Sequence, residues 1–254
     1  MEHNEMPTVS VIMPAYNAQR FVEAAIRSVM TQTFPDWELL VLDDGSTDAT
    51  LAIAQKLAQE DNRIRLLPND RNMGVARTRN RGFDLCRGRY VALLDSDDVW
   101  YPDKLEKQLC LAQRTGAALI YSAYAIVDAQ GKQVKADYLV PQKVDLTHLL
   151  KENVIGCSTV LLDRQAVGDY RFQTDFYHED YVLWLQLLQD GFTAAGCAET
   201  LVDWRYLENS RSFDKRKSAA NRWRIYRQCL KLPLGKSLWY FGSYALRGLK
   251  KYRA

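Results

Sequence analysis

The chain has 254 residues, of which 47% are hydrophobic and 26% are charged, and these proportions exclude a disordered or collagen-like chain. The length allows one large domain or two small ones. The formal net charge of +3 conceals an uneven distribution. Residues 1–214 hold 22 basic and all 31 acidic residues, a net charge of −9, whereas residues 215–254 hold twelve basic residues and no acidic one. We therefore expect one domain over 1–214 and a basic helical tail over 215–254.

The cysteines and the apolar runs indicate where the protein resides. The five cysteines are widely spaced and form no CxxC motif, so neither a disulfide framework nor a zinc ribbon is expected. No apolar run approaches the roughly 18–20 residues that span a bilayer. The amino-terminal residues also lack the basic and apolar regions of a signal peptide. These features predict a cytoplasmic protein, with the inner face of the membrane as a second location.

In the first half of the chain, β-branched apolar runs alternate with segments whose apolar residues recur at helical spacing. The pattern predicts strands over 8–13, 38–42, 64–67 and 90–94, separated by helices over 21–29, 47–59 and 75–86. This alternation predicts an α/β fold, a mostly parallel sheet with right-handed crossovers and helices on both faces. Because ligands bind such sheets outside the carboxyl ends of the strands, the residues after each strand are site candidates.

The second half of the chain is less regular. The expected elements are a helix from Pro102 to Arg114, a strand over 118–122, a hairpin around 128–131, a strand near 158–162 and a helix that opens at 176–180. The rest of 132–175 follows no clear pattern. No repeat or low-complexity linker divides residues 1–214, which supports a single domain.

Three carboxylates and a serine follow the fourth predicted strand: Asp95, Ser96, Asp97 and Asp98. Closely spaced carboxylates repel one another unless a cation is present, and hard oxygen ligands suit Mg²⁺ or Mn²⁺. Such an ion could also bind a diphosphate and neutralise its charge as it leaves. A solvated turn before a helix N-terminus explains the same residues equally well.

Two further acids, Asp43 and Asp44, follow the second predicted strand. In one interpretation Gly45 forms the turn and Ser46 or Thr47 caps the next helix. In the other, Asp43 or Asp44 accepts a hydrogen bond from a nucleobase N–H.

A third polar group, His178, Glu179 and Asp180, lies where the chain enters a helix. Acidic residues at that position offset the helix dipole and need no other role. A carboxylate at the mouth of a cleft can instead act as a general base toward a hydroxyl. His178 could contact a substrate or a metal, or be structural.

Five arginines lie between residues 77 and 89. On a helix, Arg77 and Arg81 share one face while Arg79 points elsewhere, so the arginines cannot all line one site. We expect most of them to be solvated and one or two, Arg77 among them, to contact a phosphate.

Taken in order, these motifs resemble those of the family 2 glycosyltransferases over residues 7–210. The matching segments are 9–17, 43–48, 88–98 and 178–180. The resemblance implies the nucleotide-sugar-binding α/β fold called GT-A, with a donor half over about 7–100 and an acceptor half over about 101–214. It also implies a single divalent cation, Mn²⁺ or Mg²⁺, and inverting chemistry.

The resemblance implies roles for individual residues. The donor would be bound by Pro14, Ala15, Tyr16, Asn17, Asp44, Asp95 and Ser96, with Asp44 on the base and Asp95 on the ribose or sugar. Asp97, with Asp95, would hold the metal. Asp180 would be the general base and Glu179 its supporting neighbour, with His178 and Arg77 as further substrate contacts.

The resemblance also bears on the substrates. Trp204, Arg205 and Tyr206 stand where processive polysaccharide synthases carry a QxxRW motif, which is absent here. We therefore expect transfer of one sugar per encounter, from a nucleoside-diphosphate sugar to a glycan or a lipid-linked acceptor. Region 132–175 matches no fixed family pattern, so the acceptor pocket is unassigned.

The basic tail shows helical amphipathicity. On a wheel that begins at Leu234, an arc of about 80° contains Leu234, Leu238, Phe241, Ala245, Leu249 and Tyr252. Opposite them lie Lys236, Arg247, Lys250 and Lys251. A helix within 232–254 could therefore bind an anionic membrane surface. The pattern also fits a helix that docks on the domain with its basic side in water.

Three other functions compete with sugar transfer. A nucleotidyltransferase acting on sugar phosphates usually has a glycine-rich loop after the first strand, where this chain has the segment 14–17. A Rossmann dehydrogenase would need a GxGxxG motif, which is absent. A nucleic-acid binder could use the tail, but the −9 body would repel phosphates, so we expect no nucleic-acid partner.

Overall fold

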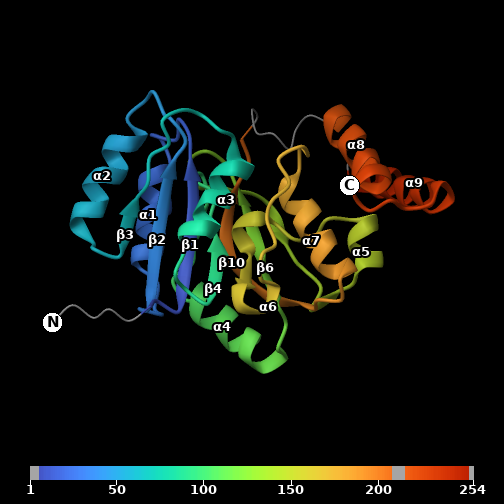
Figure 1. Ribbon diagram of the computed structural model, residues 1–254, viewed down its shortest axis with the longest axis horizontal. Helices are drawn as coiled ribbons and strands as arrows, with labels where there is room; N and C mark the ends of the chain where they lie inside the picture. Colours follow the sequence, from blue (N-terminus) through green and yellow to red (C-terminus); the bar gives the residue numbers. More distant parts are fainter. Residues whose placement is uncertain (1–5, 208–214, 252–254) are drawn as a thin grey trace.

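A computed structural model describes residues 6–207 and 215–251 of the chain (Figure 1). The amino-terminal segment 1–5 and the expected domain boundary at residue 214 lie outside the described residues. The strands are β1 Val9–Ala15, β2 Trp37–Asp43, β3 Ile64–Leu66, β4 Tyr90–Leu93, β5 Val99–Trp100, β6 Leu119–Val127, β7 Gln133–Tyr138, β8 Lys143–Val144, β9 Leu161–Asp163 and β10 Ala194–Arg205. The helices of the body are α1 Val22–Met30, α2 Thr50–Glu60, α3 Val75–Leu85, α4 Lys104–Thr115, α5 Leu146–Lys151, α6 Arg164–Val167 and α7 Glu179–Gln189. The tail consists of α8 Lys215–Arg224, a π-helical segment Ile225–Cys229 (η3) and α9 Leu234–Lys251.

The described strands form one sheet in the order β3-β2-β1-β4-β9-β6-β10-β5, with β7 on β6 and β8 on β10. The strands β1, β2, β3, β4, β6 and β10 point in one direction, and the other four point in the opposite direction. The expected mostly parallel sheet is therefore confirmed. Strands from both predicted halves of the body belong to this one sheet.

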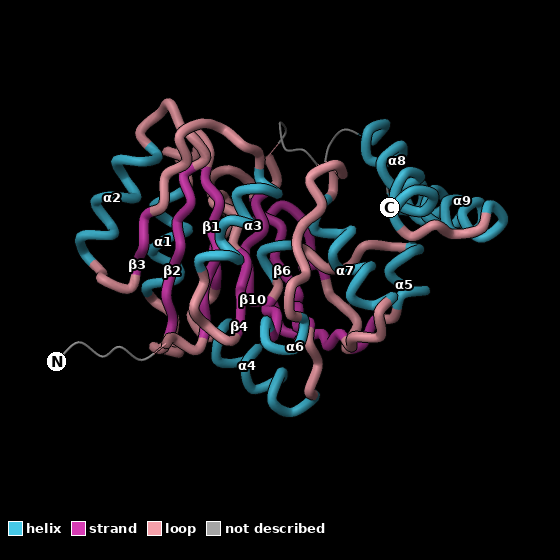
Figure 2. Tube along the Cα trace, in the orientation of Figure 1, coloured by secondary structure: helices cyan, strands magenta, loops and turns pink. Residues whose placement is uncertain are grey.

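Side chains of β1 and β2 are buried along their whole length because helices cover both faces of the sheet. Alternate residues contribute to two separate cores: Val11 faces the core that includes α1, α2 and α4, and Ile12 faces the core that includes α3, α5 and α7. Figure 2 shows the loops that follow β1 and β2 gathered at the same end of the sheet. The carboxyl ends of the central strands therefore meet at one edge, as the alternation predicted.

Several boundaries differ from the predicted ones. Strand β1 continues through Pro14 and Ala15, which pair with β2. Pairing of β1 with β4 ends at Ile12, so Pro14, which has no N–H, lies beyond that ladder. Helix α2 begins at Thr50 rather than 47, because the Asp48 carboxylate accepts the Thr50 N–H at 2.9 Å. The expectation that Ser46 or Thr47 caps this helix is wrong.

Strand β10 was not predicted from the sequence. It pairs with β6, and the register shifts twice, between Cys197 and Thr200 and between Thr200 and Asp203. These irregularities remove the strict apolar–polar alternation that marks a strand. The hairpin expected around 128–131 is confirmed as the turn between β6 and β7.

The tail packs on α5 and α7 at the end of the molecule opposite to α2 (Figure 1). The expected helix from Leu234 is confirmed as α9. Within the described ranges, no helix combines the length and the apolar composition needed to cross a bilayer.

Candidate active site

A cleft of about 830 Å³ opens at the carboxyl ends of β1, β2 and β4. Residues from both predicted halves line it. The predicted site residues among them are Pro14, Ala15, Tyr16, Asn17, Asp44, Arg77, Asp95, Ser96, Asp97 and Glu179. Asp180 and His178 do not line the cleft, although Asp180 directly follows a residue that does.

The loop after β1 forms one wall of the cleft. Tyr16 is 50% exposed at this wall, so its ring is available to a planar ligand. Asn17 has a φ of 48°, and its Oδ1 accepts the Thr47 N–H at 2.9 Å. The Asn17 N–H donates to the Ser46 Oγ at 3.0 Å. Asn17 therefore fixes the loop after β1 to the loop after β2.

Asp44 is buried and holds the loop before α3. Its Oδ1 accepts hydrogen bonds from the Asn69 side-chain amide at 2.7 Å and the Met73 N–H at 2.9 Å. Its Oδ2 accepts the Gly74 N–H at 2.9 Å. Asp44 also lines the cleft, so it contributes to the cleft wall as well as to the conformation of this loop. Neighbouring Asp43 is buried outside the cleft lining.

The three acids after β4 have different surroundings. Asp95 and Asp97 line the cleft, whereas Asp98 is buried behind it. The Asp98 carboxylate accepts hydrogen bonds from the Ser158 hydroxyl at 2.5 Å and the Arg205 N–H at 2.9 Å. Burial, with the charges of Asp97 and Asp95, raises the pKa of Asp98 well above its usual range. Asp98 is therefore a structural link between β4, the segment around Ser158 and β10.

Asp97 is the acid best suited to a cation. Burial, reinforced by the charge of Asp95, raises the pKa of Asp97 to about 6. A divalent ion would relieve this destabilised charge, so the donor set fits Mg²⁺ or Mn²⁺. In the described part of the chain, no group of three or more His, Cys, Asp or Glu side chains could hold a metal. A Mg²⁺ ion held by one or two carboxylates together with substrate phosphates needs no such group.

Arg79 connects the two halves of the site. It comes from α3, and its guanidinium lies 2.5 Å from Asp95 Oδ1 and 2.6 Å from Glu179 Oε1. The side chain is buried and also lies over the Phe172 ring, 5.3 Å from the ring centroid. These ion pairs hold Asp95, from the predicted donor half, beside Glu179, from the predicted acceptor half.

Arg79 was not predicted as a site residue. Arg77 is exposed and lines the cleft, as expected, and Arg81 binds the carbonyls of Leu67 and Pro68. A sequence signal for Arg79 did exist, because the residues three and four positions away are all apolar: Val75, Ala76, Gly82 and Phe83. A lone arginine on the buried face of a helix needs partners of opposite charge.

Glu179 and Asp180 begin α7, as predicted, but they differ in what they contact. Glu179 is buried and bound to Arg79. Asp180 forms no ion pair among the described residues, and its Oδ1 accepts the N–H of Tyr181 at 2.8 Å. Burial and the charge of Glu179 raise the pKa of Asp180 to about 6. This value is suited to a general base near neutral pH.

His178 points toward the tail rather than the cleft. Its Nε2 lies 3.0 Å from the hydroxyl of Ser218 on α8. The neighbouring Tyr177 N–H donates to the Asn221 side chain at 2.9 Å. Since Ser218 and Asn221 lie about 40 positions away, the sequence offered no signal for these contacts.

A larger cavity, of about 1460 Å³, lies between α4 and the first residues of β10. These residues are at the amino end of a strand parallel to β6, so the cavity opens at the edge opposite to the acidic cleft. Of its acids, Asp103 and Glu199 form ion pairs with Lys107. The smaller cleft, where the strands end and the carboxylates converge, is therefore the candidate active site.

The family match and the sequence relatives of this chain agree with each other. Residues 10–166 match glycosyl transferase family 2. TuaG of Bacillus subtilis (strain 168), named for teichuronic acid biosynthesis, is 38% identical over 248 residues, which cover 98% of each chain. WfgD of Escherichia coli is 37% identical over 246 residues, which cover 96% of this chain and 94% of WfgD. WfgD is named as a UDP-Glc:α-D-GlcNAc-diphosphoundecaprenol β-1,3-glucosyltransferase.

Two solved structures share the fold at low sequence identity. A structure of S. aureus TarS 1–349 with UDP-GlcNAc matches with a TM-score of 0.74 and 18% identity, covering 94% of this chain and 71% of that one. The mannosyltransferase PcManGT from Pyrobaculum calidifontis, with GDP-Man and Mn²⁺, matches with a TM-score of 0.68 and 16% identity, covering 99% and 76%. The expected GT-A fold is thereby confirmed.

Proposed function

Because the chain belongs to glycosyl transferase family 2 and is a glycosyltransferase, we propose that it moves one sugar from a nucleoside-diphosphate sugar to a lipid-linked or glycan hydroxyl. We further propose that the transfer is metal-dependent and inverts the anomeric centre. The observation that carries this proposal is the Arg79 bridge, which holds Asp95 beside Glu179 in one cleft. Asp180 directly follows Glu179 in the chain. Transfer requires that donor-binding groups and a base meet at one point.

The relatives narrow the substrate classes. TarS binds UDP-GlcNAc and PcManGT binds GDP-Man with Mn²⁺, which supports a nucleotide-sugar donor and a divalent cation here. WfgD is named for a sugar linked to diphosphoundecaprenol, and TuaG is named for teichuronic acid biosynthesis. We therefore infer a role in bacterial polysaccharide synthesis, with a diphosphate-linked lipid as the favoured acceptor.

The donor would lie along the loops after β1, β2 and β4. The exposed ring of Tyr16 would stack on the base, and the Asp44 carboxylate would accept a base N–H, since both residues line the cleft. Asp97, with Asp95, would hold the divalent cation, which would supply positive charge to the departing diphosphate. The exposed Arg77 is available to the same phosphates.

The acceptor reaction would use Asp180 as the general base. Its carboxylate takes the proton from the acceptor hydroxyl while that oxygen bonds to the anomeric carbon. The bond from this carbon to the diphosphate oxygen breaks, the nucleoside diphosphate leaves with the bonding electron pair, and the anomeric configuration inverts. Glu179 is bound to Arg79 and would position Asp180 rather than accept the proton.

The test uses purified protein, Mn²⁺, a panel of UDP- and GDP-sugars and a polyprenyl-diphosphate-linked sugar as acceptor. Wild-type protein should release nucleoside diphosphate and extend the acceptor. Asp180→Asn should lower transfer by about 10²–10⁴-fold while donor binding, measured by thermal shift, is retained. Release of pyrophosphate would instead indicate a nucleotidyltransferase, and full turnover by Asp180→Asn would reject the assigned base.

A further inference from the structure

One face of helix α9 packs against α5 of the body and against α8 and η3 of the tail. Ser237 is fully buried on this face, and three aromatic residues continue it. Tyr240 packs near Tyr226, with 6.4 Å between ring centroids, and Phe241 packs edge-on against Trp223 at 5.7 Å. The Tyr244 ring lies 4.1 Å from the Arg222 guanidinium. The predicted alternative in which this helix docks on the domain is therefore observed.

A second face of α9 is apolar and exposed. It carries Leu234, Leu238, Trp239 and Leu246, whose exposed fractions are 56%, 57%, 69% and 64%. At about 100° per residue these side chains cover an arc of roughly 140°. The described residues between them on the arc, Gly235, Gly242 and Ala245, carry no charge. This membrane face, defined by the four large side chains, differs from the arc expected from sequence because Phe241 turns inward.

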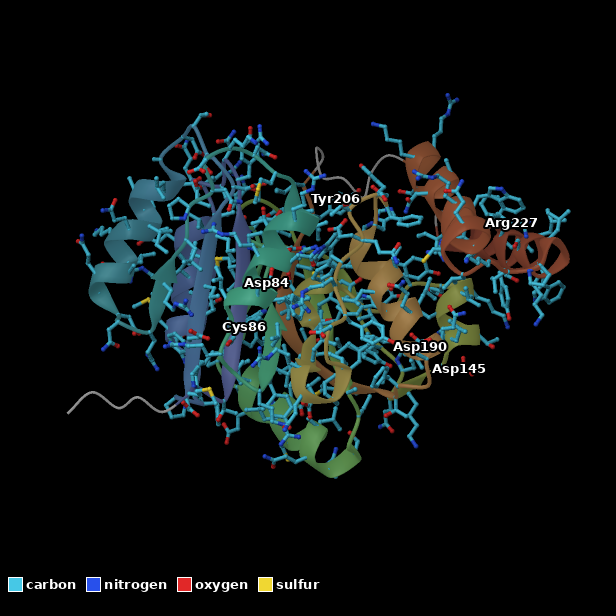
Figure 3. The ribbon with its side chains drawn as sticks, in the orientation of Figure 1. Asp84, Cys86, Asp145, Asp190, Tyr206 and Arg227 are labelled. Atoms are coloured by element: carbon cyan, nitrogen blue, oxygen red, sulfur yellow. The ribbon has the colours of Figure 1, made fainter. Side chains whose placement is uncertain are left out.

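Side chains beyond Leu246 fall outside what the structure describes, which includes Leu249 and Tyr252 of the expected arc. The sequence nevertheless gives the whole tail twelve basic residues and no acidic one. Exposed cations in its described part include Arg224, Arg227, Lys231 and Lys236. Figure 3 labels Arg227 in the tail, among side chains that extend away from the body.

We propose that the membrane face binds the surface of a bilayer that contains anionic lipids. Exposed leucine and tryptophan side chains in a tail that also exposes cations fit the boundary between acyl chains and anionic headgroups. A second copy of this chain is a poorer occupant, because two such faces would bring together two tails that each carry only positive charge.

The tail also contacts residues that precede and follow Asp180, the proposed base, in the sequence. Before Asp180, Ser218 and Asn221 of α8 contact His178 and Tyr177. After it, Arg222 donates a hydrogen bond to the Tyr181 hydroxyl at 2.8 Å. These contacts would hold the acceptor side of the cleft near the membrane, where a lipid-linked acceptor resides. This step rests on the proposed function.

The experiment is sedimentation of the full chain with vesicles, without donor or acceptor. Wild-type protein should bind equimolar phosphatidylglycerol–phosphatidylcholine vesicles, bind pure phosphatidylcholine weakly, and lose binding at high salt. The double variant Leu238→Gln, Trp239→Gln removes two exposed apolar side chains and should bind at least about tenfold more weakly. Leu139→Gln is the matched control, because Leu139 is 71% exposed in the body, and it should bind as wild type.

Two results would overturn the proposal: no wild-type binding to the anionic vesicles, or equal binding by the double variant. A wild-type dimer that the double variant converts to monomer would assign the face to a second copy and also overturn it. Circular dichroism of the double variant checks its fold, and donor hydrolysis without vesicles should equal the wild-type rate. Failure of vesicle binding with intact hydrolysis leaves the proposed function standing, so the two are tested separately.

Discussion

Arg79 and Glu179 lie 100 positions apart in the chain and form a 2.6 Å ion pair in which the two side chains are 4% and 5% exposed. The same guanidinium binds Asp95, so one buried cation serves two carboxylates of the cleft. Removing one partner of such a group leaves uncompensated buried charge, which is strongly unfavourable. This relationship makes Arg79 a positioning residue for both halves of the site.

Arg79→Met should lower the free energy of unfolding by about 3–5 kcal/mol, because Glu179 is left buried without its cation. Urea denaturation measures this change. Arg114→Met, at an exposed arginine of α4, is the control and should change stability by less than about 0.5 kcal/mol. The double variant Arg79→Met, Glu179→Gln should lose less than the two single losses combined. Strict additivity would show that the pair is not coupled.

Transfer should depend on pH through Asp180, whose pKa is raised to about 6 by burial and by Glu179. A base must be ionised to act, so activity is present above this pKa and lost as pH falls through it. We expect kcat/KM to fall about tenfold per unit below about pH 6. Donor affinity measured over the same pH range separates this effect from changes in binding. A flat profile between pH 5 and 8 would contradict the assignment.

Asp97→Asn should stabilise the metal-free protein at pH 8. The pKa of Asp97 rises from 3.8 to about 6 on folding, so the neutral carboxyl present below pH 3.8 is tolerated in the fold. As pH rises through 6 the buried side chain ionises, and this charge destabilises the folded state. Removing the carboxylate should therefore add about 1–3 kcal/mol at pH 8 in EDTA and almost nothing near pH 4. With Mn²⁺ at pH 8 the wild-type protein should instead be more stable than Asp97→Asn, since the ion binds the carboxylate that the variant lacks. Thermal unfolding of both proteins at pH 8 and pH 4, each in EDTA and with Mn²⁺, tests the stabilisation without metal and its reversal with metal.

Gly45 and Gly131 provide a matched pair of substitutions. Both have positive φ, 73° and 81°, but a Cβ on Gly45 would lie 2.8 Å from the Asn72 nitrogen, whereas one on Gly131 would meet nothing within 4 Å. Gly131→Ala should cost about 1–2 kcal/mol from backbone strain alone. Gly45→Ala should lower the free energy of unfolding by about 2 kcal/mol more, because its Cβ meets the Asn72 nitrogen. It should also weaken donor binding, because Asp44 precedes Gly45. Equal losses in urea denaturation would contradict the close approach.

The periodicity of the first half was sufficient to predict β1, β2, β3 and β4 and their common edge. Strands buried on both faces give continuous apolar runs, and the polar residues after them stand out for that reason. Strand β10 lacked such a run because its register shifts twice. Local patterns therefore located the donor side of the cleft better than the acceptor side.

The residues of the site were predicted less completely than the fold. Asp95, Asp97 and Glu179 meet in the cleft as expected, but Asp98 is held by Ser158, 60 positions away. His178 likewise faces Ser218 on α8. Such partners are set by tertiary structure, so spacing along the chain could not distinguish a structural acid from one that faces a ligand.

The position of β9 between β4 and β6 has a consequence for synthesis on the ribosome. Until Leu161–Asp163 has emerged, β4 is an edge strand with unpaired backbone groups along one side. Exposed apolar edges of this kind associate with other chains. A nascent or truncated chain that ends before β9 should therefore be prone to aggregation, and the shortest soluble fragment should extend past Asp163. The segment matched to the family, which ends at residue 166, includes this closing strand.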